Sequence, residues 1–518
     1  MREDRLDNMQ SIDFLKSIPL RKSKNTAVSL TFCPNSTSAS VALLPSAPSP
    51  REKVRAFGAK PPDKRQFILV YFPLGMCRIS LVMKMMKSIW AETALSQFPS
   101  LQGDKNTQVL VIGGGMAGLL CAYKLTQVGA NVVLVEAGRI CGGVTQNTTA
   151  KITSQHGLVY HKLLQKLGRE KAKLYLQANE AAVAQYTQLC KEIPCRFEAQ
   201  NAFVYSLEDR QILEQEAHAL HLLGYPASVK EDLPLPFQTV GAVKFRHQAQ
   251  FHPLEFAAHI ARDLTIFENT LVRRIDGNTA VTDKGSIRAE KIIVATHFPF
   301  LNTHGSYFLK LYQHRSYVLA LENTDFPGGM YIGAEENSPS LRLFGQQLLL
   351  GGGGHRTGHQ GGGWKELSEL AARAYPHAKE VARWATQDCM SLDAVPYIGP
   401  YSKNTPNLFV ATGFNKWGMT GSMVAANILT DLVLEKENPW AEVFSPSRSI
   451  LKPQLAINAA ETTLNLLRPT APRCPHMGCA LKWNPQERSW DCSCHGSRFT
   501  EDGQLINNPA QKGLKHRS

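Results

Sequence analysis

The sequence lacks a long uninterrupted apolar segment. Its most apolar stretch, residues 67–83, is interrupted by Pro73, Gly75 and Arg78, and it is shorter than the about 20 residues that a membrane-spanning helix needs. The N-terminus also lacks the pattern of a secretory signal peptide, because acidic residues stand among its first few positions and no apolar core follows. We therefore predict a cytoplasmic protein without a transmembrane segment.

A basic stripe interleaved with aromatic residues is also missing. The formal net charge is +14, but residues 1–87 hold fifteen Lys or Arg against six Asp or Glu, so +9 of the excess lies there. A charge excess confined to one end of a chain is typical of a solvated tail, whereas nucleic-acid-binding proteins carry it on one face or along a helix. Nucleic acid is therefore not a predicted partner.

The first 85 residues show no sustained hydrophobic periodicity. They are rich in Ser, Pro and basic residues and lead up to three methionines, Met83, Met85 and Met86. A segment of this kind is typical of disorder. We predict that residues 1–85 are a disordered leader or a gene-model extension, with no function of their own.

The cysteines do not form a secreted disulfide framework. Seven of the eleven are spread over the first 400 residues of a 518-residue chain, whereas disulfide scaffolds are short and cysteine-dense. Hydrophobic residues make up 43% of the chain and charged residues 19%, which is typical of a globular protein. The remaining four cysteines lie close together near the C-terminus and need a separate explanation.

A dinucleotide-binding fingerprint opens the main part of the chain. The strand-like QVLVIG leads through a glycine turn into the helix-like MAGLLCAYKLTQVG, and the strand-like NVVLVEA follows. Gly113, Gly115 and Gly118 form GxGxxG at this turn, where they allow a tight bend, approach of a pyrophosphate and packing of the helix on the strand. Glu136 ends the second strand, where a carboxylate can accept hydrogen bonds from a ribose hydroxyl. These features together predict a bound dinucleotide.

The residues that follow favour FAD over a nicotinamide. Arg139, the CGG at 141–143 and the TTAKIT run at 148–153 extend the site beyond Glu136. GRICGGVT and NTTAK, with IIVATH at 292–297 and ATGFNKWGMTGS at 411–422, resemble the glycine/D-amino-acid oxidase (DAO) family of FAD-dependent oxidoreductases. This resemblance implies that the chain is an enzyme that binds FAD.

The resemblance also implies individual flavin contacts. Besides the three glycines and Glu136, these are Arg139, Thr149, Gly413 and Thr420. His297 stands where that family commonly has a glycine, and the sequence shows no clear cysteine for a covalent link to the flavin.

Four metal-ligating side chains lie close together near the C-terminus. Cys474 and His476 form C-x-H, and after 15 residues Cys492 and His495 form C-x-x-H. Two thiolates can hold one iron and two neutral imidazoles the other, which is the Rieske arrangement of a [2Fe–2S] cluster. Paired Cys and His at short spacing also suit tetrahedral zinc, so the spacing alone leaves both metals open.

The surrounding residues resemble the two cluster-binding loops of Rieske proteins. They read CPHMGC at 474–479 and CSCHGSRF at 492–499. The resemblance implies a [2Fe–2S] cluster and a disulfide between Cys479 and Cys494 that joins the loops. It also implies that Ser497 hydrogen-bonds a bridging sulfide and that Phe499 replaces a tyrosine of high-potential relatives. Without this hydroxyl we expect a lower reduction potential than in respiratory Rieske centres.

We predict an α/β fold, with an FAD-binding Rossmann-type domain, an inserted α+β substrate domain and a small C-terminal all-β Rieske domain. Periodicity favours helices at residues 158–192 and 252–264, and strands at 271–275, 279–288 and 291–296. The glycine clusters at 351–354 and 361–363 are expected to be loops, and a short helix is expected within 453–472. The predicted domains are 86–435 for the oxidoreductase, 436–455 for a linker and 456–518 for the Rieske domain.

Candidate substrate residues follow from charge and position. Arg315 and Arg356 are candidates to clamp a carboxylate through bidentate hydrogen bonds. Lys416 is a candidate to lie over the flavin, and Lys151 and His297 are candidates for contact with its isoalloxazine ring. An ordinary structural role stays open for each of the five.

The combination of motifs resembles bacterial flavoproteins in which an amine-oxidase-like domain is fused to a Rieske module. It implies oxidation of a small amine or amino-acid-like substrate, with electrons passing through the cluster to a protein, a quinone or oxygen. Such an acceptor could hold the protein at a membrane surface. Fusing the two cofactors has a physical reason, because flavin chemistry moves two electrons and the cluster moves one at a time.

Three alternatives stay open. An NAD(P)H-dependent electron-transfer reductase is expected to carry a second GxGxxG, but Arg356 stands where its third glycine should be. A Rieske oxygenase needs two histidines and a carboxylate at a mononuclear iron, and His355 and His359 have no acid at helical spacing. A non-catalytic redox sensor is not excluded by any residue.

Overall fold

The computed structural model describes residues 26–31, 40–45, 86–336, 338–469 and 472–514. The chain divides into two compact units, residues 1–72 and 73–518. In the first unit the described residues form two antiparallel strands, β1 (Thr26–Thr31) and β2 (Ser40–Pro45). The rest of the predicted leader lies outside the described residues.

The predicted βαβ unit is present at the start of the second unit. Strand β3 (Lys105–Ile112) leads into helix α3 (Met116–Gln127), and β4 (Val132–Val135) pairs with β3 in parallel. Both strands are fully buried over their apolar residues, as expected for a parallel sheet covered on both faces. They lie near the centre of an eight-stranded sheet with the order β10-β11-β12-β3-β4-β9, in which β19 pairs with β12 and β18 with β19.

The remaining strands of this first sheet come from two later parts of the chain, residues 265–294 and 397–412. Their bounds are β9 (Thr265–Phe267), β10 (Val272–Asp276), β11 (Thr279–Thr282), β12 (Ser286–Val294), β18 (Tyr397–Pro400) and β19 (Leu408–Thr412). The strand expected over 279–288 is therefore two strands, because the chain reverses at the left-handed Gly285 and β11 pairs antiparallel with β12.

A second sheet of nine strands forms the inserted domain. Its order is β17-β13-β16-β15-β14-β6-β8-β5, and β7 pairs with β8. The glycine cluster expected as a loop at 351–354 lies instead within strand β16, because its neighbours on both sides pair with β13. The strands are β5 (Lys151–Ile152), β6 (Glu198–Ser206), β7 (Ser228–Lys230), β8 (Gly241–Gln250), β13 (Leu311–Glu322), β14 (Met330–Gly333), β15 (Ser340–Phe344), β16 (Gln347–Arg356) and β17 (Lys379–Ser391).

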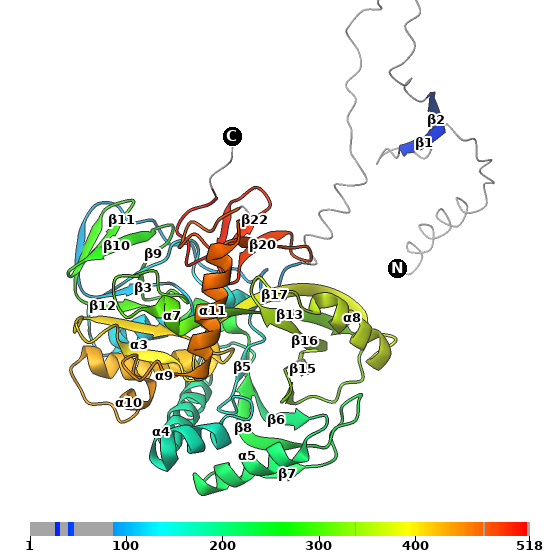
Figure 1. Cartoon of the computed structure of the whole chain (residues 1–518), viewed down its shortest axis with the longest axis horizontal. Coiled ribbons are helices and arrows are strands. Elements are labelled where there is room, and N and C mark those ends of the chain that lie inside the picture. Colours follow the sequence, from blue (N-terminus) through cyan, green and yellow to red (C-terminus); the bar gives the residue numbers. More distant parts are fainter. Residues whose placement is uncertain (1–25, 32–39, 46–85, 337, 470–471, 515–518) are drawn as a thin grey trace, which may run out of the picture. The chain divides into compact units, whose positions relative to one another are not determined.

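Helices cover the two sheets (Figure 1). The predicted helices at 158–192 and 252–264 appear as α4 and α6, and α3 packs against α9 over a shared apolar core. None of the described helices has both the length and the apolar character needed to cross a membrane. The helices of this part are η1 (Val144–Asn147), α4 (Tyr160–Leu189), α5 (Arg210–Leu222), α6 (Pro253–Ile260), α7 (Tyr307–Lys310), α8 (Gly363–Ala374), α9 (Gly418–Val433) and α10 (Ala441–Phe444).

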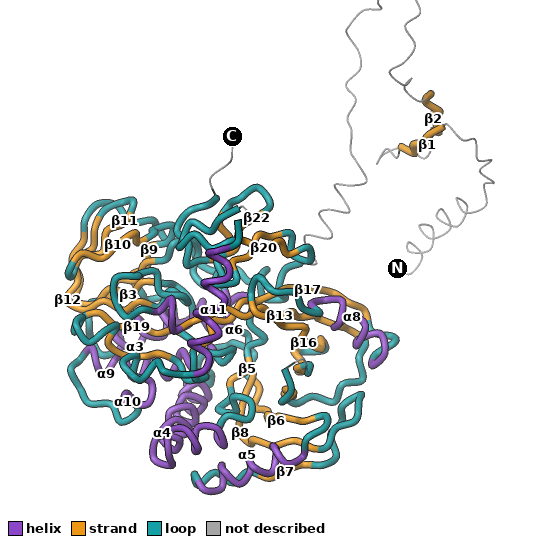
Figure 2. Tube along the Cα trace, viewed as in Figure 1, coloured by secondary structure: helices purple, strands orange, loops and turns teal. Residues whose placement is uncertain are grey.

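The C-terminal part is small and built around one antiparallel sheet. Helix α11 (Pro453–Leu467) precedes it and is longer than the short helix expected there. Figure 2 shows that loops make up much of this part, and its buried core is separate from the cores of the larger domain and contains all four clustered cysteines. The strands are β20 (Leu481–Asn484), β21 (Ser489–Cys492), β22 (Arg498–Thr500) and β23 (Leu505–Asn507).

The segment predicted as a linker is ordered. It contains α10 and the first residues of α11, and Arg448 within it forms a buried ion pair with Asp393, with an Nη2–Oδ1 distance of 2.8 Å. The flavin-binding and cluster-binding parts of the chain therefore belong to one compact unit. The domain limits predicted from the sequence stay predictions.

Candidate functional site

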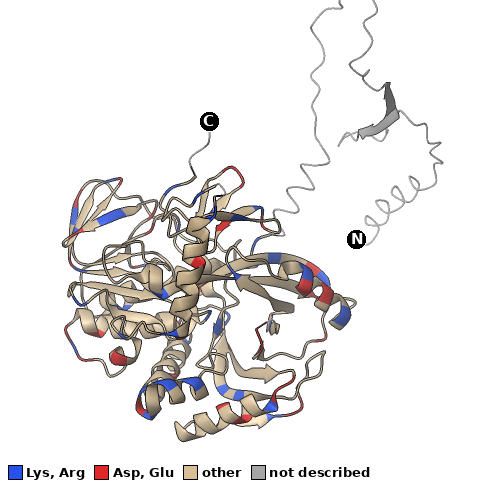
Figure 3. Cartoon of the chain, in the orientation of Figure 1, with Lys and Arg blue, Asp and Glu red and all other residues tan. Residues whose placement is uncertain are grey.

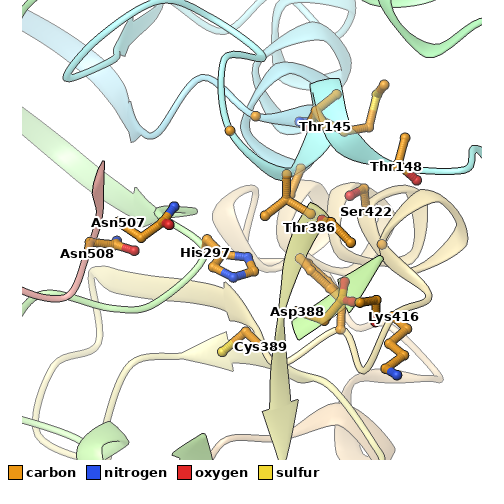
Figure 4. A pocket seen from close by; sticks show the side chains of 18 of the residues that line it. Thr145, Thr148, His297, Thr386, Asp388, Cys389, Lys416, Ser422, Asn507 and Asn508 are labelled. Carbon is orange, nitrogen blue, oxygen red and sulfur yellow. Dashed lines mark hydrogen bonds between the residues drawn. The ribbon is translucent and has the colours of Figure 1, made fainter. Parts of the chain in front are cut away.

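One cavity of about 820 Å³ collects residues from three distant parts of the chain. The glycine turn and the end of β4 form one wall, and strands β13, β16 and β17 of the second sheet form another. A third contribution is the segment Leu505–Gln511 of the C-terminal part (Figure 4). The cavity therefore adjoins both the fingerprint and the cluster-bearing domain.

The three fingerprint glycines have the geometry that their spacing predicts. Gly113 has a φ of +110°, and a Cβ there would lie 2.5 Å from the carbonyl oxygen of Ala295. A Cβ on Gly118 would lie 1.9 Å from the carbonyl oxygen of Gly113, so only glycine lets helix α3 approach this turn. Gly113 and Gly115 line the cavity, and a Cβ on Gly115 would have only Oγ1 of Thr145 near it, at 3.6 Å. This leaves an open backbone cradle of the kind that a pyrophosphate occupies.

Glu136 lines the cavity at the end of β4. Its Oε2 accepts the N–H of Gly114 at 2.7 Å, and its Oε1 accepts the N–H of Gly138 at 2.9 Å. Burial raises the pKa of Glu136, and these two N–H groups oppose that rise. Each carboxylate oxygen retains a lone pair for a ribose hydroxyl.

Arg139 also lines the cavity, and it is held by an acid that the sequence did not point to. Its Nε lies 3.2 Å from Oε2 of Glu268, which is completely buried. The other oxygen of Glu268 accepts the N–H of Ile140 at 2.8 Å. Glu268 therefore fixes the loop after Glu136, although it lies more than 100 residues further along the chain.

Of the three other predicted flavin contacts, one lines the cavity and two lie next to residues that do. Thr149 lines the cavity, whereas Gly413 and Thr420 are not among the described residues that do so. Thr420 donates its hydroxyl to the carbonyl oxygen of Thr153 at 2.9 Å, which ties α9 to the end of β5. The residues next to Gly413 and Thr420, Phe414 and Met419, do line the cavity.

Three of the five candidate substrate residues line the cavity: Lys151, His297 and Lys416. Burial and the nearby Arg342 lower the pKa of Lys151 to about 7. Burial also lowers the pKa of His297 to about 4, so this imidazole is neutral at physiological pH. His297 has a φ of +65°, a left-handed backbone that explains why glycine suits this position.

The cavity also contains a half-buried acid that sequence reasoning missed, Asp388 on β17. Burial raises the pKa of Asp388, whereas the positive charges of Lys416 and Arg315 oppose that rise. Lys416 responds in the opposite sense, because burial lowers its pKa and Asp388 opposes the change. Figure 4 shows the two side chains in the same part of the cavity. No motif marks Asp388, since it follows from strand pairing within the second sheet.

The two arginines expected to clamp a carboxylate lie elsewhere, and this corrects that expectation. Arg315 is buried against Glu487 of the C-terminal part, with Nε donating to Oε1 at 2.9 Å. Arg356 donates through Nε to the carbonyl oxygen of Ser493 at 3.1 Å and through Nη1 to Asn458 at 2.9 Å. Both guanidinium groups therefore join the two parts of the chain, and neither residue is among those described as lining the cavity.

The clustered cysteines converge on one point. The Sγ atoms of Cys479, Cys492 and Cys494 lie within 4.8 Å of one another, and Cys474 hydrogen-bonds Cys492. Hydrogen bonds from the thiols of Cys474, Cys479 and Cys494 hold the pKa of the Cys492 thiol well below its usual range. Cys479 and Cys494 are free cysteines in the structure, and the predicted disulfide is not formed.

The two histidines complete the predicted ligand set. The rings of His476 and His495 lie 4.9 Å apart between centroids. Both Nδ1 atoms are buried without a hydrogen-bond partner, although buried imidazole nitrogens are ordinarily satisfied. Burial lowers the pKa of both rings, so both are neutral as metal ligands must be. Both rings also interact electrostatically with the Cys492 thiol. The two orphaned nitrogens fit a cluster that takes two thiolates and two imidazoles.

Ser497 and Phe499 both lie buried in the C-terminal part. Ser497 is buried, hydrogen-bonds Cys474, and accepts the N–H of Ala510 at 3.0 Å. Phe499 is completely buried in the small core and has no hydroxyl to offer.

A short loop separates the cavity from the histidines. His297 lines the cavity, while the next residue, Phe298, packs edge-on against both rings, 6.4 Å from His476 and 6.1 Å from His495 between centroids. Asn508 holds this loop by donating to the carbonyl oxygens of Thr296 at 2.8 Å and Phe298 at 3.1 Å. The cavity and the metal-ligating side chains are therefore neighbours.

Comparison with known proteins agrees with this geometry. The family of FAD dependent oxidoreductases (DAO) matches residues 108–432. The chain belongs to this family. The Rieske [2Fe-2S] domain matches residues 448–517. FAD and a Rieske [2Fe–2S] cluster are thus the cofactors of this oxidoreductase, as the sequence predicted.

One relative of this chain aligns with it over most of both lengths. YhfW of Bacillus subtilis (strain 168), which is named a Rieske 2Fe-2S iron-sulfur protein, is 35% identical over 82% of this chain and 96% of its own length. Among solved structures, glycine oxidase from Geobacillus kaustophilus shares 20% identity and a TM-score of 0.57 over 67% of this chain and all of its own. L-proline dehydrogenase from P. horikoshii shares 16% identity and a TM-score of 0.56 over 67% and 98%. These two likenesses confirm the predicted fold of the flavin part.

Proposed function

We propose that this chain oxidises a small amine or amino-acid-like substrate and passes the electrons through its Rieske cluster to an acceptor. The observation that carries the proposal is the shared cavity, which is lined by the dinucleotide fingerprint and by Leu505–Gln511 of the cluster-bearing part. FAD supplies a two-electron acceptor and the cluster a one-electron carrier, so two electrons drawn from one C–N bond can leave singly.

Charges in the cavity support a substrate that carries both an ammonium and a carboxylate. Lys416 and Asp388 both line the cavity, where Asp388 is half-buried and the Lys416 side chain is open to the cavity space. A carboxylate beside Lys416 and an ammonium beside Asp388 would meet opposite charges where little water screens them. We assign to these two residues the task of orienting the substrate, in place of Arg315 and Arg356. The related folds named for glycine and proline support the same substrate class.

Lys151 is the proposed proton acceptor. Its pKa of about 7 leaves a fraction of the amine uncharged at neutral pH, which is the state that can take a proton from a substrate ammonium. Oxidation of the amine to an imine removes two electrons and two protons in all. The neutral His297 contributes an uncharged wall beside the loop that leads to the cluster ligands.

The electron acceptor is a protein, a quinone or oxygen, and the proposed location is the cytoplasm. We also propose that Cys479 and Cys494, whose sulfur atoms lie within 4.8 Å of each other, join in a disulfide once the cluster is in place. The two electrons and two protons that the thiols lose pass to an external oxidant such as molecular oxygen. Peptide mapping of the holoprotein after alkylation without reductant tests this pairing. Finding both cysteines alkylated would remove it.

The test of the main proposal is an anaerobic reduction of the holoprotein by a panel of amines and amino acids. We expect at least one of them to bleach the flavin absorbance and to produce the EPR signal of the reduced cluster. Cys492→Ser is the matched control, because it should still bleach but give no cluster signal. Rapid bleaching by NADH with none by any amine would overturn the proposal in favour of a reductase.

A further inference from the structure

Helix α11 turns its polar face toward the protein interior and its apolar face toward solvent, the opposite of an ordinary surface helix. The side chains that it buries are Asn458 and Asn465, and Glu461 between them faces the same way at the spacing of one helix face. Asn458 accepts a hydrogen bond from Arg356 at 2.9 Å. Glu461 accepts from His359 at 3.0 Å and lies 3.4 Å from Nζ of Lys482. The polar face of α11 is therefore used inside the protein.

The outward face of α11 is apolar. Ile457, Leu464 and Leu467 have exposed fractions of 56%, 62% and 75%, and their spacing places them on one stripe of the helix. Leu451, just before the helix, is 83% exposed. Figure 3 shows α11 almost wholly without charge colouring. Exposed leucines are ordinary one at a time, but a continuous apolar stripe indicates a contact surface.

The apolar stripe of α11 adjoins the cluster-binding loop at 474–479. Arg473 donates through Nη1 to the carbonyl oxygen of Leu466 at 3.1 Å and to that of Gly478 at 3.0 Å. Met477, which directly follows the ligand His476, is itself exposed. The apolar stripe and the less buried of the two ligand histidines therefore belong to adjoining segments.

Positive charge stands at both ends of the stripe. Lys452 precedes α11, and Arg468 and Arg473 follow it, both exposed. The only acidic residue of the helix, Glu461, faces inward and is paired. An apolar stripe flanked by cations complements an anionic lipid surface, where cations meet headgroups and leucines meet acyl chains.

The dimensions of α11 favour this partner over a second copy of the chain. Fifteen residues make a helix about 22 Å long, which is too short to cross a hydrocarbon core of about 30 Å but long enough to lie along its surface. One face of such a helix offers on the order of 200 Å², whereas a stable protein interface buries about 800 Å² on each partner.

We propose that the outward face of α11 docks this protein on an anionic membrane surface. Ile457, Leu464 and Leu467 insert at the level of the upper acyl chains, and Lys452 and Arg468 lie among the headgroups. The cluster loop at 474–479 then lies beside the membrane. This docking does not depend on which substrate the flavin oxidises.

The experiment is co-sedimentation of the full-length holoprotein with vesicles of equal parts phosphatidylglycerol and phosphatidylcholine. We expect binding that falls several-fold in 0.5 M salt and in vesicles of phosphatidylcholine alone. The double variant Leu464→Ser/Leu467→Ser should partition at least tenfold more weakly while its flavin absorbance, cluster EPR spectrum and melting temperature stay unchanged. Val128→Ser/Leu222→Ser, which alters exposed apolar residues elsewhere, is the matched control and should bind like the parent chain.

Three results would overturn the proposal. The parent chain could fail to sediment with either vesicle. The double variant could bind as well as the parent, which would assign binding to another part of the chain, such as the basic residues 1–87. Sedimentation equilibrium could show a dimer that the double variant abolishes, which would make a second copy of the chain the occupant of this face.

Discussion

At the scale of single residues, Gly118 shows how little space the flavin turn leaves. The Cβ of an alanine at this position would lie 1.9 Å from the carbonyl oxygen of Gly113. A contact this close involves backbone on both sides, so helix α3 has to shift away from the turn. The glycine is therefore a requirement of the site and not only of the helix.

We expect Gly118→Ala to lower the free energy of unfolding by about 1–3 kcal/mol and to reduce the flavin content of the purified protein. The measurements are the melting temperature and the ratio of flavin to protein absorbance. Gly129→Ala is the matched control for flavin content, because Gly129 is not among the residues that line the cavity and a Cβ there meets no heavy atom within 4 Å. Its φ of +84° means that this variant should also lose some stability. A Gly118→Ala protein with full flavin content would contradict the role given to this turn.

The lowered pKa of Lys151 predicts how the rate of flavin reduction depends on pH. Because its pKa is about 7, the amine is charged below this pH and uncharged above it. If it accepts the substrate proton, the rate of flavin reduction should rise about tenfold per pH unit below pH 7 and level off above it. Stopped-flow measurement from pH 5.5 to 9 checks this.

Lys151→Met should abolish this inflection and lower the rate at high pH. His297→Asn serves as the control, since burial lowers the pKa of His297 to about 4 and the ring does not titrate in the tested range. An inflection that persists in Lys151→Met would assign it to the substrate or to another group.

At the scale of elements, the turn between β20 and β21 locks the cluster-bearing part onto the second sheet. Glu487 in this turn contacts Arg315 of β13 and, at 2.8 Å, Arg498 of β22, and all three side chains are almost fully buried. The hydroxyl of Tyr317, which lines the cavity, donates to Glu487 at 3.1 Å. Arg498 also lies 2.9 Å from Asp491, so every charge in this network has an opposite partner.

We expect Glu487→Gln to destabilise the protein by about 3–5 kcal/mol, because it leaves two buried guanidinium groups without their shared carboxylate. Glu501→Gln is the matched control. Glu501 pairs with Arg488 on the exposed surface, where loss of a pair costs less than about 1 kcal/mol. Chemical denaturation and hydrogen exchange across β20–β22 measure the difference, and equal effects of the two variants would contradict a locked interface.

The same network has a pH dependence with a defined sign. Burial by itself raises the pKa of Glu487, but Arg315 and Arg498 bring it below its usual range. A depressed carboxyl pKa contributes stability above the unfolded value of about 4.3, and this contribution is lost as the pH falls through the native value. The interface should therefore hold throughout the neutral range and weaken only in strong acid.

At the scale of the whole molecule, the flavin and cluster parts form one unit but have separate cores. The small core around the cluster consists of four cysteines, Leu481, Phe499 and Ala510. Because most of these residues surround the cluster, little apolar packing is left without it. The larger cores do not include any of these cysteines.

Removal of iron and sulfide with a chelator under reducing conditions should therefore act locally. We expect residues 472–514 to lose protection from hydrogen exchange while β3, α3 and α9 keep theirs. The flavin should become easier to remove, since Leu505–Gln511 lines its cavity. Uniform loss of protection across both parts would show that they unfold as one cooperative unit.

The sequence by itself determined the glycine turn and the acid at the end of the second strand, and it was enough to predict four cluster ligands. Each of these depends on spacing over a few residues, and the local backbone is enough to bring such side chains together. The helices α4 and α6 and the βαβ unit were predictable for the same reason, because their periodicity is local. The strand at the 351–354 glycines was not, since pairing with β13 overrides the local preference for a loop.

Only the tertiary structure decided which charges line the cavity. Arg315 and Arg356 read as carboxylate clamps in isolation, but Glu487 and Ser493, more than 130 residues away, occupy them. Asp388 and Leu505–Gln511 carry no motif and reach the cavity only through sheet pairing and the docking of the C-terminal part. A contact between residues so far apart depends on how whole elements pack, and the spacing of residues along the chain holds no record of that packing.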